Sequence, residues 1–502
     1  MVKLKLIYKR KGSGVLKKTN FKDVVFYIIV WGAAILLGSI ALISIFISGP
    51  SVIKMPFYFS FAYLIIAVLV IFSIYKLNLL SKINTKVFIA LLIIIALLPR
   101  LAWIYYVQTQ PFSDFLHLHD YGINASQGNF KGFVNFYAVF PFKIGFGMVL
   151  AALYSLFGTD IIAVKLFNVI LSVILVLLLY AGGKMLYNEK AGRIAALLAA
   201  VWPAQIMYTS VIASEHLFLV LFTASVVLIL FFIKKYNYKN YKFFNGNLIL
   251  IGIGVLTAAA QLIRPMSMVL LPVFAVFILI YKKYRADALA GAALGIKSIV
   301  LVTVCYFALI NLVNIPVQKA TGVDITRSNA GFNLMVGTND KYDGAFNYDD
   351  FSIIEKNNYD FDKVHTEAKE IAFQRLKSNP LQIIKLVMRK YKILWGNENY
   401  GYYWSTVSSE SHGQADIVKS HPRLFYGISQ AFYIVVLLMA ILSCFYTLIQ
   451  KRYDALIILM IFGGILISYT LLEVQCRYHM PVVPLLILFG TSFCAGSKKL
   501  EI

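Results

Sequence analysis

Long apolar runs, separated by short polar segments, dominate the chain. A helix needs about 20 predominantly apolar residues to cross the hydrocarbon core of a bilayer. Runs of this kind occur near 24–48, 57–75, 87–107, 161–182, 194–209, 215–233, 247–263, 266–281, 297–314, 425–449, 455–472 and 480–494. The pattern therefore predicts an all-α polytopic membrane protein with about 12 transmembrane helices.

The distribution of charge decides whether one further run, 138–158, crosses the membrane. If it does not cross, the segments on the side of the basic N-terminus hold 26 Lys and Arg, and the short loops on the other side hold 5. If it crosses, the four lysines between 234 and 242 move to the outside. Because Lys and Arg concentrate in cytoplasmic loops, we expect 138–158 to be a re-entrant or juxtamembrane outer helix. Both termini are then cytoplasmic.

Two outer segments are long in this topology. The segment 108–160 includes the non-crossing helix, and 315–424 has a soluble composition, with 14 Lys and Arg against 13 Asp and Glu. The stretch 362–392 has helical periodicity that is broken at Asn379-Pro380. We therefore predict an N-terminal transmembrane region (1–314) with the first outer loop 108–160, a small extracytoplasmic domain (315–424) and C-terminal transmembrane helices (425–502).

The composition excludes two other classes of protein. The chain is 60% hydrophobic and only 14% charged, which is too apolar for an ordinary soluble domain or a disordered chain. A net charge of +24 usually suggests a nucleic-acid partner. Here the cytoplasmic segments hold 26 positive and 5 negative residues, so the surplus reflects orientation in the membrane and contact with anionic lipid. We expect no nucleic-acid partner.

Five ionisable residues converge on the outer membrane surface in this topology. Asp114 follows the third run, Glu215 opens the sixth, Arg264 ends the seventh, Arg477 precedes the last, and Lys143 begins the non-crossing helix. Charges at membrane depth are costly unless they are paired, so these residues are functional candidates. Acids beside several cations suit a general base and an anionic lipid head group. Taken singly, each acid is also compatible with a helix cap, and each arginine with a side chain that reaches the interface.

Two other clusters have less specific patterns. His117, His119 and Asp120 are spaced like metal ligands, but residues two apart lie on different faces of a helix, which favours a loop surface. The four cysteines form no CxxC or Cys/His cluster. The sequence therefore identifies no metal-binding residues and no certain cofactor, and a divalent metal is compatible with it but unsupported. The aromatic segment WGNENYGYYW (395–404) is compatible with stacking on sugar rings and with an interfacial belt.

Several motifs follow one another along the chain from about residue 98 to 490. They are PFSDF, YGINASQGNF, FPFKIG, GTDIIAVKLFNVILSV, YNEKAGRIAALLAAVWPAQIMYTSVIASEHLF, LIRPMSMVLLP, GFNLMVGTND and RYHMPVVPLL. As an ordered set they resemble the glycosyltransferase family 39 group, which includes protein O-mannosyltransferases and the lipid A aminoarabinose transferase. The resemblance implies a membrane glycosyltransferase of GT-C fold, and the first two apolar runs lie outside it.

The resemblance also assigns roles to the five candidate residues. Asp114 falls at the position of the catalytic acid in the first outer loop, and Glu215 at an acid that begins a later span. Lys143 is near a lysine that contacts the donor phosphate in relatives, and Arg264 and Arg477 fall on recurrent arginines of the outer rim. Many relatives have an Asp-Glu pair in the first loop, whereas here a phenylalanine follows Asp114. That difference leaves Asp114 as the sole acid there and puts a two-acid or metal-bound site in doubt.

The implied activity is transfer of a sugar from a polyprenyl-phosphate donor to an acceptor hydroxyl on the outer face of the membrane, with inversion at the anomeric carbon. The acceptor is left open between a lipid, a cell-wall polymer, another glycan and a protein. The 36 Lys against 11 Arg hint at a low-GC bacterium, whose carrier would be undecaprenyl phosphate and whose location would be the plasma membrane. Two alternatives are a transporter or flippase of a lipid-linked sugar and a membrane scaffold with a binding domain at 315–424.

Overall fold

The chain is helical throughout the part that the structure describes. The computed structural model describes residues 21–46, 55–56, 58–76, 82–132, 134–236, 241–281, 288–378, 380–411 and 413–495. Within these ranges the only β pairing is an isolated bridge between Thr109 and Ser409. The basic segment 1–20, which supplies part of the predicted cytoplasmic charge, lies outside the described residues.

Eight helices of the described ranges are long and apolar enough to cross a membrane, so the expected multi-pass membrane protein is confirmed. Polar side chains cap two of them: Asn84 accepts a hydrogen bond from Lys86 N–H at 2.9 Å, and Asp160 one from Ile162 N–H at 2.8 Å. The eight are α1 (Phe21–Phe46), α3 (Thr85–Tyr106), α7 (Ile161–Leu186), α10 (Glu215–Lys235), α11 (Phe243–Ile263), α13 (Ala288–Thr321), α20 (Pro422–Gln450) and α21 (Leu456–Leu471), the last extended by a 3₁₀ turn from Tyr453.

The other four apolar runs form shorter or broken helices, so the count of about 12 spans stays a prediction. The run 194–209 is divided between α8 (Glu189–Ala200) and α9 (Pro203–Tyr208), because Pro203 lacks the N–H that would continue the first helix. In the run 480–494 the eight-residue α22 lies between two 3₁₀ elements, and every residue of α22 is buried. The remaining elements of these runs are α2 (Tyr58–Lys76), η2 (Ser267–Val269), α12 (Leu270–Tyr281), η5 (Cys476–Val482), α22 (Val483–Gly490) and η6 (Ser492–Ala495).

The first outer loop contains three helices: α4 (Asp114–Ser126), α5 (Val134–Val139) and α6 (Lys143–Phe157). With 15 residues, α6 is about 22 Å long, whereas the hydrocarbon core of a bilayer is about 30 Å thick. Its length therefore favours the non-crossing helix expected for 138–158. The orientation of this helix in a membrane stays a prediction.

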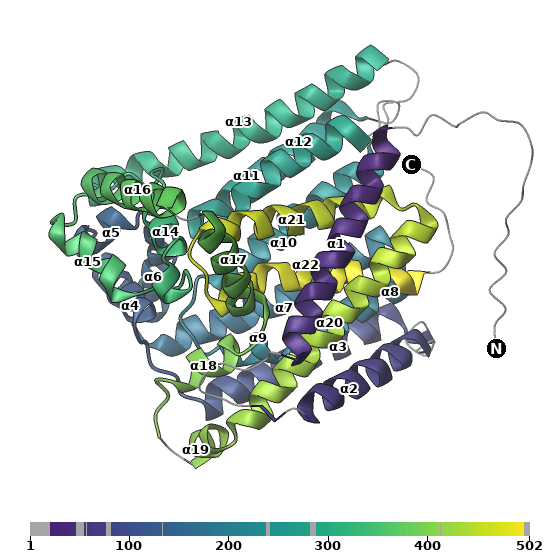
Figure 1. Cartoon of the computed structure of the whole chain (residues 1–502), viewed down its shortest axis with the longest axis horizontal. Helices are drawn as coiled ribbons and strands as arrows, with labels where there is room; N and C mark the ends of the chain where they lie inside the picture. Colours follow the sequence, from purple (N-terminus) through teal and green to yellow (C-terminus); the bar gives the residue numbers. More distant parts are fainter. Residues whose placement is uncertain are drawn as a thin grey trace, which may run out of the picture.

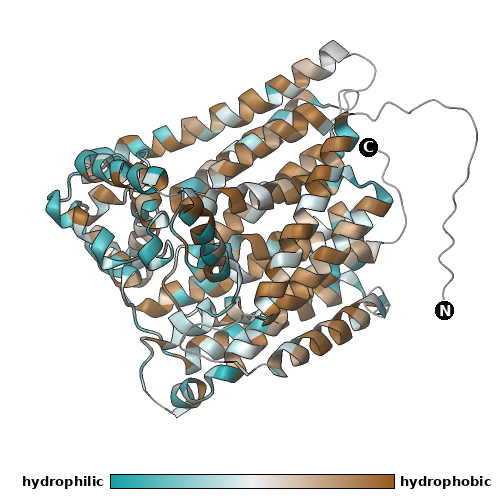
Figure 2. Ribbon diagram, viewed as in Figure 1, coloured by the Kyte–Doolittle hydropathy of each residue, from teal (hydrophilic) through white to brown (hydrophobic). Residues whose placement is uncertain are grey.

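The segment between α13 and α20 is also helical. The predicted break at Asn379-Pro380 stays a prediction, because residue 379 lies outside the described residues, which are helical up to Ser378 and again from Pro380. Figure 1 places α14, α15 and α16 together at one end of the molecule, and Figure 2 shows that this end is mostly hydrophilic. The helices are α14 (Ala330–Gly337), η3 (Asp340–Tyr342), α15 (Tyr348–Lys356), α16 (Phe361–Ser378), α17 (Pro380–Trp395), α18 (Tyr400–Thr406) and α19 (Gly413–Ser420).

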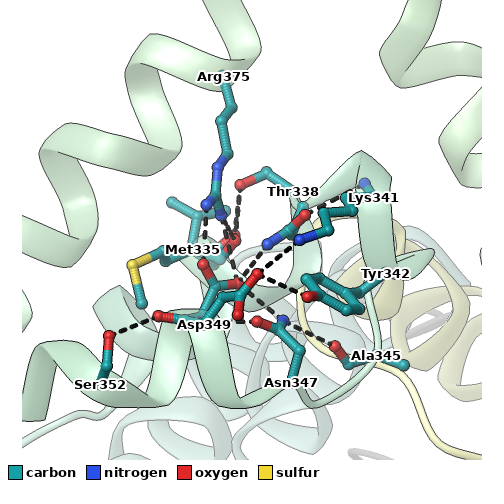
Figure 3. A network of polar contacts seen from close by, with 12 residues as sticks. Met335, Thr338, Lys341, Tyr342, Ala345, Asn347, Asp349, Ser352 and Arg375 are labelled. Carbon is teal, nitrogen blue, oxygen red and sulfur yellow. Dashed lines mark hydrogen bonds and ion pairs between the residues drawn. The ribbon is translucent and has the colours of Figure 1, made fainter.

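The two outer segments share one apolar core. Val139 and Phe140, at the end of α5, pack with Phe332 of α14 and with buried residues of α15 and α16. A polar network holds the loop between α14 and α15, and Figure 3 shows it. In this network Asp350 accepts a hydrogen bond from Arg375 at 2.8 Å and another from Asn347 at 3.0 Å. The outer helices are therefore fixed to the first outer loop.

A buried lysine joins this outer region to the spanning helices. Lys390 of α17 donates hydrogen bonds to the carbonyl oxygens of Gly337, at 2.8 Å, and Thr470, at 2.9 Å. A Cβ atom at Gly337 would overlap the carbonyl oxygen of Leu471, so only glycine allows α14 to approach the end of α21 this closely. The helices between α13 and α20 consequently pack against the end of α21, where the candidate site is found.

Candidate functional site

A cavity of about 710 Å³ lies between the first outer loop, the outer helices and the ends of α11 and α21. Four of the five candidate residues line it, namely Asp114, Lys143, Arg264 and Arg477. Glu215 does not line the cavity. It is buried directly behind the two arginines, with 3% of its side chain exposed. The structure therefore brings together all five residues, although they are up to 363 positions apart in the sequence.

Asp114 and Lys143 form an ion pair at the mouth of this cavity. Lys143 Nζ lies 3.1 Å from Asp114 Oδ1, and 46% of the Asp114 side chain is exposed. The ammonium group also lies over the rings of Phe136, at 4.5 Å, and Phe140, at 5.3 Å. The positive charge of Lys143 is the main cause that lowers the pKa of Asp114 below its usual value. In this state Asp114 is an accessible carboxylate of low basicity.

The two arginines share Glu215 as a counter-charge. Arg264 Nη1 lies 2.7 Å from Glu215 Oε1, and Arg477 Nε lies 3.6 Å from the same oxygen. Arg477 Nη2 also lies 3.9 Å from Asp114 Oδ2, so its guanidinium connects the two acids. The rings of Phe115 and Trp404 are each 5.0 Å from that guanidinium. Arg477 lines the cavity, and its Nη1 is buried without a hydrogen-bond partner within the described ranges.

Helix ends carry four of these charges. Asp114 is the first residue of α4, and Ser113 before it has a positive φ of 53° that turns the chain into the helix. Glu215 begins α10, and Arg264 directly follows α11. The acids thus lie at the positive ends of helix dipoles, and the arginine lies at a negative end. Lys143 is the exception, because it begins α6 and depends on Asp114 for compensation.

Close helix packing places Lys143 near Arg264. A Cβ atom at Gly145 would overlap the carbonyl oxygen of Leu262, so α6 lies directly on the last turn of α11 only because residue 145 is glycine. The need for this close contact explains why the motif FPFKIG ends in glycine. The lysine and the glycine two positions later act together, one as a charge and the other as a contact surface.

A fully buried polar centre fixes η5, the element that carries Arg477. His479 contacts the carbonyl oxygen of Leu394 through Nδ1, at 2.6 Å, and Glu398 through Nε2, at 2.5 Å. Glu398 also accepts a hydrogen bond from the Trp202 indole at 2.9 Å. Both contacts of His479 are with oxygen atoms from the segment 394–398, so its two ring nitrogens tie η5 to the end of α17 and the residues after it. This centre sets the position of Arg477 without reaching the cavity.

The aromatic segment 395–404 divides between two environments. Trp395 and Tyr400 are buried, with 0% and 1% exposure, and both rings pack against His479. Only Trp404 at the end of the segment lines the cavity. The segment as a whole is therefore neither a stacking platform for sugars nor an interfacial belt, and Trp404 alone is placed to contact a ligand.

The histidine cluster of the first outer loop lies on α4. His119 Nδ1 contacts the hydroxyl group of Tyr154 at 2.6 Å, and His117 packs against the ring of Phe136. Across the described ranges, no group of three or more His, Cys, Asp or Glu side chains is arranged to hold a metal ion. The requirement for a metal is untested.

The sequence did not single out Glu473, which also lines the cavity. Its carboxyl group is buried, and it accepts hydrogen bonds from Tyr478 O–H at 3.0 Å and from Gln475 Nε2 at 3.1 Å. Burial raises the pKa of Glu473 above its usual value, which is the opposite of the shift at Asp114. A signal was present in the sequence, because Glu473 directly follows an apolar run and stands four positions before Arg477.

Apolar side chains form the remaining wall of the cavity, on the side of α12 and α21. These residues are Met266, Met268, Val269, Leu271, Pro272, Ile465 and Ile467. Two of these side chains, Met268 and Ile467, are also exposed at the surface of the molecule, with exposed fractions of 51% and 72%.

A family model described as dolichyl-phosphate-mannose-protein mannosyltransferase matches residues 144–310, about a third of the chain. The expected resemblance to glycosyltransferase family 39 is confirmed over that region, which includes Glu215 and Arg264. ArnT from Cupriavidus metallidurans, solved as a crystal structure bound to undecaprenyl phosphate, is similar to this chain at 12% identity, over 82% of this chain and 78% of that chain, with a TM-score of 0.32. That superposition is too loose to assign the GT-C fold, which stays a prediction. No curated protein is significantly similar to the chain.

Proposed function

We propose that the protein is a membrane glycosyltransferase that moves a sugar from a polyprenyl-phosphate donor to an acceptor hydroxyl. The observation that carries the proposal is one cavity that combines a carboxylate, three cations and an apolar wall. The match of residues 144–310 to a family of mannosyltransferases supports the same class of reaction. The acceptor is a lipid, a cell-wall polymer, another glycan or a protein.

The charges of the cavity match those of such a donor. Lys143, Arg264 and Arg477 contribute three positive charges, and Asp114 and Glu215 contribute two negative ones, which leaves +1. A sugar linked to a polyprenol through one phosphate is a phosphodiester with a single negative charge. The donor therefore neutralises the cluster, and the guanidinium groups bind its phosphate oxygens.

The reaction is a single displacement at the anomeric carbon. The acceptor oxygen forms the new bond to that carbon while the bond from the carbon to the phosphate oxygen breaks, which inverts the configuration. Asp114 takes the proton of the acceptor hydroxyl. The bonding electrons leave with the polyprenyl phosphate, and Arg264, Arg477 and Lys143 stabilise its growing negative charge.

Binding of the donor prepares Asp114 for this role. In the free protein Lys143 keeps the pKa of Asp114 low, which makes the carboxylate a weak base. A phosphate that draws Lys143 towards itself weakens that ion pair and adds a negative charge nearby. Both changes raise the basicity of Asp114 when donor is present. Glu215 is buried behind the arginines, so we assign it a positioning role, in which it holds the two guanidinium groups.

The orientation follows from the distribution of charge in the sequence. We place the protein in the plasma membrane with both termini in the cytoplasm, the cavity at the outer face, and residues 315–424 as an extracytoplasmic domain above it. The carrier is undecaprenyl phosphate in a bacterium. The fold is GT-C-like.

The test uses the purified full-length protein in detergent, where no gradient exists. It is incubated with undecaprenyl-phosphoryl sugars labelled in the sugar and with an envelope extract as the source of acceptors. The proposal expects the label to appear in a covalently modified acceptor, with release of undecaprenyl phosphate. A flippase of lipid-linked sugars would instead move labelled lipid across a vesicle membrane and leave every donor molecule chemically unchanged, which would contradict the proposal.

A further inference from the structure

The cavity contains a second polar group that the charged residues do not explain. It consists of Glu473, Gln475, Asn329 and Asn333, which we call the amide wall, and all four residues line the cavity. The backbone N–H of Glu473 donates to the carbonyl oxygen of Asn333 at 2.9 Å, and Gln475 binds the Glu473 carboxyl. Asn329 caps α14, one turn before Asn333. The wall thus joins the segment after α21 to the outer helix α14.

Much of the hydrogen-bonding capacity of the amide wall is unused. Glu473 Oε1 accepts both hydrogen bonds of that carboxyl, whereas Oε2 has no partner within the described ranges. Over the same ranges, the side-chain amides of Asn329 and Asn333 make no hydrogen bond, although Asn329 is only 5% exposed. None of these side-chain atoms is among the fully buried polar atoms, so they are open to the cavity and available to a polar ligand.

The polar groups of the amide wall are better suited to bind a carbohydrate than to bind a phosphate or a lipid chain. Phosphate oxygens only accept hydrogen bonds, and they need the donors and positive charges of the arginine cluster. A lipid chain would leave the carboxyl and amide groups desolvated and unpaired. A carbohydrate hydroxyl both donates and accepts, as amides and a protonated carboxyl do.

Aromatic rings stand beside the amide wall. The rings of Tyr469 and Tyr478 stack at 5.6 Å with planes 21° apart, and Tyr478 donates its hydroxyl hydrogen to Glu473. Tyr478 also contacts the charged cluster, because the Arg264 guanidinium lies 5.7 Å from its ring. Tyr478 therefore marks the boundary between the phosphate-binding cations and the amide wall.

We infer that the amide wall is a carbohydrate subsite in which Glu473 determines specificity by binding a hydroxyl group of the transferred sugar or of a carbohydrate acceptor. The inference rests on the proposed function, because it divides one cavity among the parts of a sugar-phosphate-lipid donor and its acceptor. It assigns the cations to the phosphate and the Met and Ile wall to the lipid.

The protonation state of Glu473 suits this role. Burial raises the pKa of Glu473, so protonation, which lets the carboxyl donate as well as accept, costs less here than at an exposed site. The charged and titratable groups that face it come from four helical elements: Asp114 from α4, Lys390 from α17, Tyr469 from α21, and Arg477 and Tyr478 from η5.

The first experiment measures binding of bare undecaprenyl phosphate and of a panel of undecaprenyl-phosphoryl hexoses and pentoses to the full-length protein in nanodiscs. Wild type should bind at least one sugar-bearing lipid more tightly than the bare lipid. Glu473→Ala should weaken that complex about tenfold and leave the bare lipid within twofold, because one hydrogen bond to a carboxyl is lost. Glu473→Gln, which keeps a donor and an acceptor, should retain most of the affinity, and Glu355→Ala is a matched control away from the cavity.

A second arm separates the sugar of the donor from a carbohydrate acceptor. Methyl glycosides are titrated into wild type and Glu473→Ala that are saturated with undecaprenyl phosphate. If the hydroxyl belongs to the acceptor, glycoside binding is lost in the variant while its preference among donor lipids survives. Loss of the donor preference alone assigns the hydroxyl to the transferred sugar.

Two results would overturn the inference. In the first, wild type binds every sugar-bearing lipid no better than the bare lipid and binds no glycoside. In the second, Glu473→Ala matches wild type with all probes. The proposed function fails separately: if Arg477→Lys binds bare undecaprenyl phosphate as wild type does, the phosphate assignment is wrong whatever Glu473 does.

Discussion

At the scale of single residues, the cavity contains two carboxyl groups in opposite environments. Asp114 faces Lys143 and Arg477, and its pKa is lowered, mainly by the lysine. Glu473 has no ion-pair partner among the described residues, and burial raises its pKa. Two acids whose pKa values are moved apart suit different roles, one as a proton acceptor and the other as a hydrogen-bonding group.

Replacing Asp114 by Asn tests its role as the base. The variant keeps the shape of the side chain but cannot accept the proton, so transfer of labelled sugar should fall about 100-fold or more. Binding of undecaprenyl phosphate should be unchanged or tighter, since a negative charge is removed. Asp120→Asn, on the same helix but outside the cavity, is the control. Full transfer activity in Asp114→Asn would show that Asp114 is not the base.

The sequence allowed five of the site residues to be predicted, because each is an ionisable residue at the end of an apolar run. Their roles came from the family resemblance, because the apolar pattern by itself did not distinguish them. Glu215 has the same sequence context as Asp114, yet it is buried behind two arginines, and only the packing of α10 against η5 determines this. The sequence did not predict Glu473, Asn329 and Asn333 as site residues. They come close together only because α14 packs against the segment that follows α21.

At the scale of elements, apolar periodicity predicted most helices, and close packing decided how they meet. The run 194–209 reads as one span, but Pro203 divides it into two helices. Gly145 and Gly337 have no side chain that could bind a ligand, but each allows two elements of the site to pack with their backbones in contact. Such contacts cannot be predicted from hydrophobic patterns, since the partner backbone is remote in the sequence.

Lys390 should make stability depend on pH. Burial lowers its pKa to about 7 in the folded protein, against about 10.4 for an unperturbed lysine. Between these values the unfolded chain binds more protons, so the free energy of unfolding rises with pH, and below about pH 7 this contribution is flat. Thermal unfolding in detergent should show this rise in wild type and a smaller one in Lys390→Met.

Lys390→Met should also have a lower Tm at every pH, because two carbonyl groups lose their donor. Lys385→Met, at an exposed position of the same helix, is the matched control and should follow wild type. Parallel pH profiles for wild type and Lys390→Met would show that the buried lysine does not titrate in this range.

At the scale of the whole molecule, the surplus of positive charge and the candidate site lie on different parts of the protein. Nearly all of the +24 belongs to segments predicted to be cytoplasmic, whereas the cavity cluster carries a net charge of +1. The multi-pass class was predictable from composition alone. The number of spans was not, because the apolar runs 194–209 and 480–494 are divided into short elements, and α2 is not among the eight helices long and apolar enough to cross a membrane.

Cysteine labelling tests the topology around α6. In a variant without native cysteines, Lys131→Cys and Thr159→Cys place thiols on the two sides of α6, and Lys235→Cys places one at the far end of α10. If α6 does not cross, an impermeant maleimide added to intact cells should label positions 131 and 159 but not 235. Labelling of 131 without 159 would mean that α6 spans, and the orientation of all later helices would reverse.

The most direct measurement of the central claim is mass spectrometry of envelope glycans. Cells that lack the protein are compared with cells that produce wild type or Asp114→Asn at equal levels in the membrane. The account predicts a glycan, lipid or glycoprotein species heavier by one sugar residue in wild type only, together with unused undecaprenyl-phosphoryl sugar in the other two strains. Identical envelope profiles in all three strains, or the same sugar addition with Asp114→Asn as with wild type, would contradict it.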